Sequence, residues 1–306
     1  MESRPLPLWR SMLFVPALNE RFLAGAPSRG ADCIQIDLED SIPFDRKAAA
    51  RASVPEAAQG LADAGLDVVV RINRAWRLAV PDLEASVCRP VGAINLPKVP
   101  NAAYVREIAG MLDELEAERG LLAGHTRLVV MIETAEGLVN INEIAAAHSR
   151  VVALTIGAED LALSMGMRPV SDALYVPNVQ AVAAARAAGI LPIGYVGTVA
   201  QYADRDAFRR TAEQASALGF SGGFCIHPDQ VPILNAAFSP RDEDVADARD
   251  LVAAYDDALR AGKGAVSHRG AMIDQPVADR ARGLIARHAA ITERMRPPSP
   301  QERSAQ

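Results

Sequence analysis

Short apolar, β-branched runs alternate along the chain with Ala-rich amphipathic stretches. Eight of these runs predict strands, and most are almost continuously apolar, as the strands of a buried parallel sheet are. They are Ser11–Ala17, Cys33–Glu39, Asp67–Asn73, Ala93–Val99, Arg127–Thr134, Val151–Ala158, Leu191–Gly197 and Gly223–Pro228. Helices are predicted between them, most clearly over Asn101–Arg119, with Asn101 as N-cap, and over Pro177–Ala188, with Pro177 in the first turn. The third connection is expected to be short, near Pro81–Cys88.

The number and spacing of these units favour one fold class. Eight strand–helix units in roughly 230 residues match a (β/α)8 TIM barrel. The rival architecture, a doubly wound open sheet, would carry a Gly-rich phosphate turn after its first strand, but residues 14–19 read FVPALN. Neither a dinucleotide fingerprint nor a P-loop is present in the sequence. We therefore predict an α/β fold in which residues 1–238 form a catalytic TIM-barrel domain.

The pattern changes after Phe238, where Ser239 and Pro240 interrupt the chain. Asp242–Arg260 and Val277–Arg294 each predict a helix, and a Gly-punctuated loop is expected over residues 261–270. Residues 239–296 are thus expected to form a C-terminal helical extension, which acts as a barrel cap, an oligomerisation arm or a lid over an active site. The tail over residues 297–306 is expected to be disordered.

Composition excludes several classes of protein. The chain has 306 residues, of which 50% are hydrophobic and 23% charged, so we expect an ordered globular protein. A net charge of −6 argues against a protein that binds duplex nucleic acid. No apolar stretch is long enough for a membrane span, and we expect no signal peptide at the N-terminus. Three scattered cysteines without C-x-x-C spacing fit a reducing, cytoplasmic location.

Two carboxylates follow neighbouring predicted strands. The active site of such a barrel lies at the C-terminal ends of its strands. Glu133 and Asp160 stand there on adjacent strands, and adjacent strands lie about 4.8 Å apart. Two such carboxylates can bind one divalent cation, and Mg²⁺ takes one or two protein carboxylates and leaves its other positions to water and substrate. The alternative is that each carboxylate caps the helix that follows it.

An arginine ends the apolar third strand. Arg71 is costly at this position unless it meets an anion. One possible partner is a substrate carboxylate, held through two parallel hydrogen bonds. The other partners are the carboxylates that end the second strand, Asp37, Glu39 and Asp40. We expect both kinds of contact, with the acidic side chains orienting Arg71 and one edge of its guanidinium left to the substrate.

Lys98 is the only lysine on a predicted strand, which raises the question of a Schiff base. That chemistry needs a desolvated lysine of low pKa, whereas the carboxylates near Lys98 would raise its pKa. We therefore favour a structural or carboxylate-binding role for Lys98. His227 is a lone histidine before a proline, and we favour a structural hydrogen bond over a role as catalytic base.

Eight short motifs occur here in the order in which they occur in one family. They are RSMLFVP at 10–16, DLEDS at 37–41, VRIN at 70–73, LPKV at 96–99, IETAEG at 132–137, GAEDL at 157–161, IHPDQ at 226–230 and GAMID at 270–274. In these motifs the chain resembles the citrate lyase beta-subunit-like family, which includes malyl-CoA and citramalyl-CoA lyases and belongs to the HpcH/HpaI aldolase superfamily. The resemblance extends over almost the whole chain.

The resemblance implies a magnesium-dependent barrel enzyme, a carbon–carbon lyase. It would cleave or form a 3-hydroxyacyl-CoA thioester of the malyl-, citramalyl- or citryl-CoA type, giving an acyl-CoA and a 2-oxo acid. The residues matching Glu133 and Asp160 bind the metal, and the one matching Arg71 holds the 2-oxo acid. The residue matching Asp274 reaches the site of a neighbouring subunit and handles the proton on the acyl-CoA α-carbon, in a homotrimer or hexamer.

The remaining polar residues of the motifs are assigned on the same basis. Substrate binding is expected to involve, besides Arg71, the side chains of Arg10, Asp37, Glu39 and Lys98. The phosphates of CoA need cationic contacts, for which Arg10, Lys47 and Arg51 are candidates.

The chain also departs from the family pattern. Ala17 replaces the usual Gly after Pro16, and Arg269 stands where Asp is common. Residues 74–77 read RAWR, and strand seven reads IGYVG over 193–197 where the family tends to carry Ile-Asp. We expect the changes on strands three and seven to line the pocket and to affect the choice of acyl substrate. Two other functions stay open: a metal-dependent aldolase acting on free 2-oxo acids, and a non-catalytic barrel subunit of a larger complex.

Overall fold

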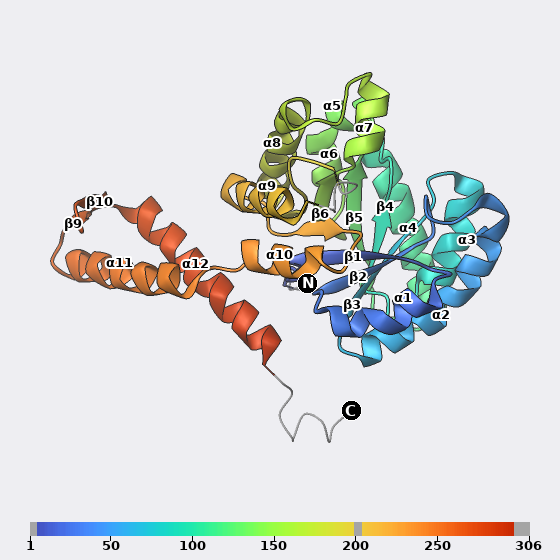
Figure 1. Ribbon diagram of the computed structural model, residues 1–306, viewed down its shortest axis with the longest axis horizontal. Helices are drawn as coiled ribbons and strands as arrows, with labels where there is room; N and C mark the ends of the chain where they lie inside the picture. The colour runs from blue at the N-terminus through green and yellow to red at the C-terminus, as the bar shows by residue number, and fades with distance from the viewer. Residues whose placement is uncertain (1–4, 199–203, 297–306) are drawn as a thin grey trace. The chain divides into compact units, whose positions relative to one another are not determined.

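Eight parallel strands form one sheet in the computed structural model, which describes residues 5–198 and 204–296 (Figure 1). The strands pair in the order β7-β6-β5-β4-β3-β2-β1-β8. Their bounds are β1 Ser11–Pro16, β2 Cys33–Asp37, β3 Asp67–Arg71, β4 Ala93–Leu96, β5 Arg127–Ile132, β6 Val151–Ile156, β7 Leu191–Pro192 and β8 Gly223–Cys225. Each strand thus pairs in parallel with its neighbours in the chain, which is the topology of a (β/α)8 barrel.

The barrel closes between its seventh and eighth strands through a short seam. Ile193 forms a single parallel bridge with Gly222. The Gly194 N–H donates to the Gly222 carbonyl at 2.8 Å, and the Ser221 N–H donates to the Pro192 carbonyl at 2.8 Å. The predicted TIM-barrel fold class is therefore confirmed.

The helices of this unit cover the outside of the sheet (Figure 1). They are α1 Glu20–Gly25, α2 Lys47–Asp63, α3 Trp76–Ser86, α4 Ala102–Glu118, α5 Ala135–Val139, α6 Ile141–Ala145, α7 Ala158–Met165, α8 Ser171–Ala187, α9 Arg205–Leu218 and α10 Gln230–Ala237, with 3-10 turns at Ala26–Arg29 and Phe44–Arg46. Alternate strand residues such as Leu13, Val15, Ile34 and Ile36 are buried against these helices, because successive side chains of a strand point to opposite faces.

The strand side chains that point the other way fill the inside of the barrel. Met12, Cys33, Val69 and Val129 belong to one buried cluster drawn from different strands. Farther along the strands the inward positions become polar, and buried Asn95 donates to the Gln35 side-chain oxygen at 2.8 Å. Asp37 lies two residues after Gln35, and Arg71 lies two residues after Val69, so the alternation itself directs these charged side chains into the barrel mouth.

The structure corrects several predicted element bounds. The predicted strands overrun by one to five residues at their C-terminal ends, where the chain leaves the sheet ladder. Pro177 lies inside α8 rather than in its first turn, since that helix begins at Ser171. The third connection is a helix of 11 residues, and residues 261–270, expected to be a loop, contain the strand Val266–His268.

One buried ion pair holds the segment between α4 and β5. Glu116 is 1% exposed and accepts hydrogen bonds from the Gly124 N–H at 2.8 Å, the Thr126 N–H at 2.7 Å and the Arg150 guanidinium at 2.7 Å. Arg150 also donates to the Thr126 carbonyl at 2.8 Å. Burial opposes the charge of Glu116, but these donors outweigh it and lower the pKa of the carboxyl to about 2.

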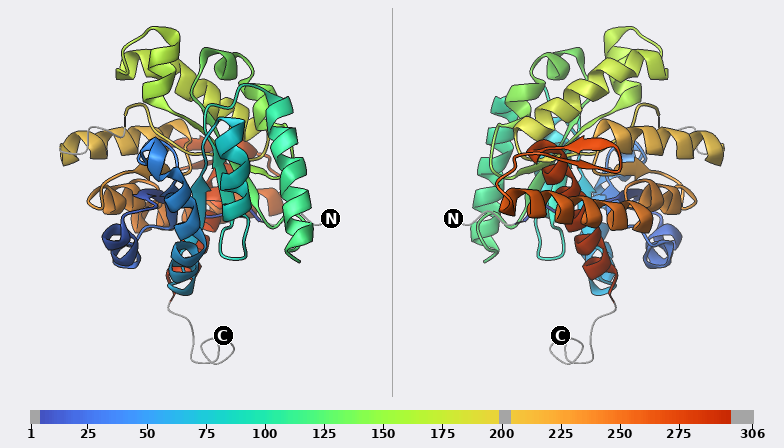
Figure 2. Two further views of the ribbon diagram at one scale, coloured as in Figure 1. Left: turned by 90° about the vertical axis from the view of Figure 1, so that its right-hand side faces the viewer. Right: turned by 90° about the vertical axis from the view of Figure 1, so that its left-hand side faces the viewer.

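The chain divides into two compact units, Met1–Phe238 and Ser239–Gln306. The second contains α11 Asp242–Arg260, β9 Val266–His268, β10 Ala271–Ile273 and α12 Gln275–Met295. Figure 2 shows its two long helices and the hairpin beside them. Its small core consists of Tyr255, Ile273 and Ala278. The predicted disordered tail, residues 297–306, lies outside the described residues. In the part of the chain that is described, no helix is long and apolar enough to cross a membrane.

Candidate active site

A cavity of about 490 Å³ opens at the C-terminal ends of the strands. It is lined by residues that end or follow seven of the eight strands: Phe14, Pro16, Phe22, Asp37, Asp40, Ser41, Arg71, Met131, Glu133, Thr155, Ile156, Gly157, Ala158, Glu159, Asp160, Gly194, Tyr195, Gly197, Thr198, Phe224 and Ile226. The cavity therefore lies where catalytic residues of (β/α)8 barrels are found.

Arg71 ends β3 and is held by three carboxylates. Its Nε and Nη2 donate to the two oxygens of Asp37 at 2.7 and 2.9 Å. Its Nη1 lies 3.0 Å from Glu39 Oε2 and 3.2 Å from Asp40 Oδ2. Burial disfavours the charge on Arg71, but Asp37 and the other two carboxylates outweigh it and raise the guanidinium pKa. Arg71 is thus a permanently charged group with a fixed orientation.

Part of this guanidinium is still open to a ligand. An arginine has five N–H donors, and in the described residues one hydrogen of Nη2 has no carboxylate partner. The Asp40 contact is the longest of the four, and the Asp40 side chain is 60% exposed, so an incoming anion can displace it at small cost. The geometry agrees with the expectation that acidic side chains orient Arg71 beside a substrate site.

Glu133 follows β5 and points into the barrel mouth. It is 3% exposed, and its Oε2 accepts a hydrogen bond from the Lys98 N–H at 2.8 Å. Burial and the nearby charge of Glu39 raise the pKa of Glu133 to about 7. The capping alternative is wrong for this residue, because the Thr134 hydroxyl, not Glu133, caps α5.

A glycine makes room for the Glu133 carboxylate. A Cβ atom on Gly157 would lie 2.2 Å from Glu133 Oε1 and 2.4 Å from its Cγ. Gly157 is the N-cap of α7, and Asp160 lies in the first turn of that helix without capping it. The turn after β6 therefore makes room for Glu133 at Gly157 and leads into the helical turn that carries Asp160.

We expect Gly157→Ala to weaken Mg²⁺ binding by roughly 10-fold, because the added methyl displaces Glu133 from its seat. Isothermal calorimetry with Mg²⁺ measures the effect, and circular dichroism checks the fold. Gly110→Ala is the matched control, since a Cβ there meets nothing within 4 Å. Equal Mg²⁺ affinity in the two variants would contradict this role for Gly157.

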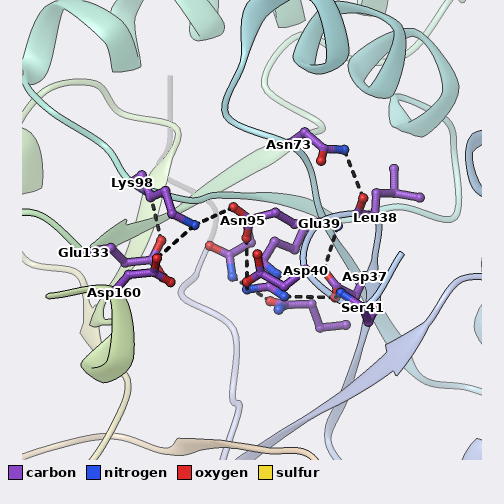
Figure 3. A network of polar contacts seen from close by, with 12 residues as sticks. Asp37, Leu38, Glu39, Asp40, Ser41, Asn73, Asn95, Lys98, Glu133 and Asp160 are labelled. Atoms are coloured by element: carbon purple, nitrogen blue, oxygen red, sulfur yellow. Dashed lines mark hydrogen bonds and ion pairs between the residues drawn. The ribbon is translucent and has the colours of Figure 1, made fainter. Parts of the chain in front are cut away.

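Lys98 connects the arginine cluster to the two carboxylates (Figure 3). Its Nζ lies 2.8 Å from Glu39 Oε1 and 3.5 Å from Asp160 Oδ1. Its backbone adopts φ 49°, a left-handed conformation that is costly for a side chain other than glycine. Burial disfavours the ammonium, but the bond to Glu39 and the charge of Glu133 outweigh it and raise the Lys98 pKa. A permanently protonated lysine does not form a Schiff base, which agrees with the role favoured from the sequence.

The donor set fits a magnesium ion. Glu133 and Asp160 converge on Lys98 and line one cavity, as neighbouring strand ends predict. Among the residues that the structure describes, no group of three or more His, Cys, Asp and Glu side chains is arranged to hold a metal. Zinc and calcium usually take more protein ligands than two, whereas Mg²⁺ is commonly bound by one or two carboxylates. The close approach of Glu133 to Gly157, which leaves no room for a Cβ atom, is consistent with such a site.

The three candidate ligands for CoA phosphates lie elsewhere. Arg10 precedes β1, at the opposite end of the strands from the cavity, and its guanidinium pairs with Asp32 at 2.8 Å. The Lys47 ammonium donates to the carbonyls of Leu38 and Glu39 at 2.7 and 2.6 Å. The Arg51 Nε donates to buried Asp82 at 2.6 Å. We therefore do not retain Arg10 as a substrate or phosphate ligand. Lys47 and Arg51 do not line the cavity, and their expected contacts with CoA phosphates stay predictions.

Two further candidates are placed by local hydrogen bonds. Asp274 lies in the second unit, where its carboxylate accepts from the Val277 N–H at 3.3 Å and caps α12. Its expected catalytic role remains a prediction. His227 accepts from the Asp229 N–H through Nδ1 at 3.2 Å, which agrees with a structural role.

Sequence reasoning missed the aromatic side of the cavity. Phe14 and Phe224 line it with their rings 5.2 Å apart, and the Arg71 guanidinium lies 4.9 Å from the centre of the Phe14 ring. The two-residue alternation along β1 was the available signal, because Phe14 shares the inward face with Met12. Of the expected sequence changes, strand seven contributes Gly194 and Tyr195 to the lining, whereas residues 74–77 do not line the cavity.

Comparison with known proteins supports these assignments of fold and class. The model of the HpcH/HpaI aldolase/citrate lyase family matches residues 10–228. Citrate lyase subunit beta of Leuconostoc mesenteroides subsp. cremoris is 36% identical over 285 residues, covering 91% of this chain and 92% of that protein. The L-malyl-CoA/beta-methylmalyl-CoA lyase of Cereibacter sphaeroides is 35% identical over 282 residues, covering 85% and 86%.

A solved structure shares the architecture. Protein CitE of Mycobacterium tuberculosis, in complex with magnesium, acetoacetate and coenzyme A, superposes with a TM-score of 0.71 at 32% identity, covering 91% of this chain and 97% of that one. These relatives confirm the resemblance expected from the eight motifs, and with it the class of carbon–carbon lyase. The chain belongs to the HpcH/HpaI aldolase/citrate lyase family.

Proposed function

We propose that this protein is a Mg²⁺-dependent lyase that cleaves or forms the carbon–carbon bond of a 3-hydroxyacyl-CoA thioester, with an acyl-CoA and a 2-oxo acid as the other reaction partners. The observation that carries the proposal is one cavity in which Glu133 and Asp160 meet beside the oriented guanidinium of Arg71. Relatives named for malyl-CoA, and one solved with magnesium, acetoacetate and coenzyme A, support the substrate class.

Glu133 and Asp160 would hold the metal. When bound, Mg²⁺ would stabilise negative charge on the substrate oxygen that becomes the carbonyl of the 2-oxo acid. Lys98 stays protonated, and its positive charge reduces the repulsion between Glu39 and Asp160 before a metal ion is bound. Lys98 thus contacts both proposed metal ligands, Asp160 through its Nζ and Glu133 through its backbone N–H.

Arg71 would bind the carboxylate of the 2-oxo acid half of the substrate. Asp37 holds the guanidinium through two hydrogen bonds and so fixes the plane in which a carboxylate can pair with it. The open hydrogen of Nη2 and the exposed Asp40 contact mark the edge from which the substrate approaches. Orientation by fixed donors lowers the entropy cost of reaching the reactive geometry.

The test is a panel of malyl-, β-methylmalyl-, citramalyl- and citryl-CoA, incubated with the purified protein and assayed for released 2-oxo acid. We expect cleavage of at least one thioester with Mg²⁺ and loss of that cleavage in excess EDTA, restored by added Mg²⁺. Cleavage of free hydroxy acids but of no thioester would favour the aldolase alternative. No cleavage of either, with Mg²⁺ still bound, would favour a non-catalytic subunit.

Asp274→Asn is expected to stop proton transfer at the acyl-CoA α-carbon while leaving binding of the 2-oxo acid unchanged. We propose that this residue acts in the site of a neighbouring subunit, in a homotrimer or hexamer, as the resemblance implies. Solvent deuterium exchange into acetyl-CoA or propionyl-CoA, followed by mass spectrometry, measures the step. Asn is a good helix cap, so the stability of α12 should be kept. Exchange at the wild-type rate would exclude Asp274 from the reaction.

A further inference from the structure

We infer that the 2-oxo acid half of the substrate carries one carboxylate and an apolar substituent, so that substrates of the citramalyl type are used in preference to those of the citryl type. The inference rests on the proposed function and narrows it. It is carried by the juxtaposition of a single arginine with an aromatic wall in an otherwise acidic cavity. Family membership does not decide this point, because the relatives include both citrate lyase and malyl-CoA lyase.

The charges that line the cavity are unequal. Among the described lining residues Arg71 is the only cation, and five carboxylates accompany it: Asp37, Asp40, Glu133, Glu159 and Asp160. Lys98 does not line the cavity, and its ammonium is already bound to Glu39 at 2.8 Å.

The wall beside Arg71 is apolar. The guanidinium lies over Phe14, and the Phe224 ring packs against Phe14. Met131, Ile156 and Ile226 extend this lining. The Tyr195 hydroxyl does not change the character of this wall, since it donates to the buried Phe224 carbonyl at 3.1 Å. A carboxylate bound to Arg71 therefore presents the rest of its carbon chain to aromatic and aliphatic groups.

A second carboxylate has no adequate partner in this arrangement. Burying a charge beside apolar side chains is costly unless a counter-charge pairs with it. Arg71 has one N–H left over and can pair with one substrate carboxylate. The other charged side chains that line the cavity are acids, which supply no counter-charge to a second carboxylate, whereas a methyl or ethyl group in the same place gains from burial by the aromatic wall.

The experiment compares citramalyl-CoA with citryl-CoA, which differ at the carbinol carbon in a methyl group against a carboxymethyl group. We expect kcat/KM with Mg²⁺ to be at least 100-fold higher for citramalyl-CoA. Equal or better cleavage of citryl-CoA would overturn the inference and leave the proposed lyase function standing. If neither compound nor any other thioester of the panel is cleaved, the proposed function itself is wrong, and this inference falls with it.

A charge-adding variant tests the physical cause. Ile226 lines the cavity and is 42% exposed, so the rim tolerates a longer side chain. Ile226→Arg should shift the ratio of the two kcat/KM values at least 10-fold toward citryl-CoA, and Ile226→Gln, which adds polarity without charge, should not. Thermal melting verifies that both variants are folded. The same ratio in both variants would contradict the electrostatic argument.

Discussion

Glu133→Gln is expected to weaken Mg²⁺ binding by roughly 100-fold or more while leaving the barrel folded, because it removes one of the two carboxylates that we propose as ligands of the ion. We expect the stability of the folded state not to decrease. Burial and the charge of Glu39 raise the pKa of Glu133 to about 7, so a neutral amide relieves a cost of the metal-free protein. We expect an unchanged or higher melting temperature together with lost metal affinity, a combination that marks a functional residue.

Glu159→Gln is the control for this experiment. Glu159 also lines the cavity and precedes Asp160, but its carboxylate accepts from the Thr198 hydroxyl and does not converge on Lys98. Calorimetric titration should give nearly wild-type Mg²⁺ affinity for Glu159→Gln and a loss for Asp160→Asn similar to that for Glu133→Gln. Unaltered Mg²⁺ affinity in Glu133→Gln would remove this residue from the metal site and, with it, the main support for the proposed lyase.

Glu116→Gln is expected to lower the free energy of unfolding by about 3–5 kcal/mol, because it leaves the buried Arg150 guanidinium without its counter-charge. The new amide also places N–H donors where the Gly124 and Thr126 N–H groups donate. Urea unfolding measures the loss. Tryptophan fluorescence reports on the first unit alone, since both tryptophans, Trp9 and Trp76, lie within it.

The same network predicts how stability depends on pH. The folded state lowers the pKa of Glu116 to about 2 from an ordinary value of 4.5. The ionised carboxylate therefore stabilises the fold fully above about pH 4.5, and this contribution is lost as the pH falls through about 2. The stability gap between wild type and Glu116→Gln should thus narrow between pH 5 and pH 2.

Asp113→Asn is the matched control, because Asp113 contacts the same guanidinium from an exposed position, with 61% of its side chain accessible. Its loss should cost less than about 1 kcal/mol, as is usual for exposed ion pairs. A cost for Glu116→Gln no larger than that of Asp113→Asn would contradict the assigned role of the buried network.

The fold was largely predictable from local pattern. Apolar runs separated by amphipathic helices specify a (β/α)8 barrel because each run must be buried on both faces. Strand ends were less predictable, since Leu38 and Ile72 remain fully buried beyond the last ladder bonds. Pro177 was misplaced because proline is usually found in the first turn of a helix, whereas here it lies in the interior of α8.

The candidate site was predictable where a side chain's place follows from the strand that carries it. Arg71 and Glu133 end inward-facing alternations, so their convergence follows from barrel geometry. Arg10 was misjudged although its position was readable, because a residue before β1 lies at the opposite end from the site. Two other features depend on packing between distant segments, which spacing along the sequence does not encode. They are the hydrogen bonds of Lys47 with two carbonyls and the space that Gly157 leaves for Glu133.

The short seam that closes the barrel has a consequence for how this protein can adapt. β7 has two residues and β8 three, and one bridge connects the two segments. Few hydrogen bonds must therefore break for the barrel to open transiently between β7 and β8. Arg71 ends β3, and Glu133 and Asp160 lie in the segments that follow β5 and β6, whereas the seam lies between β7 and β8. Mutations near Gly194 and Phe224 can therefore change the size of the cavity while Arg71, Glu133 and Asp160 keep their positions. Among the strands of the barrel, amide hydrogen exchange should be fastest in β7 and β8.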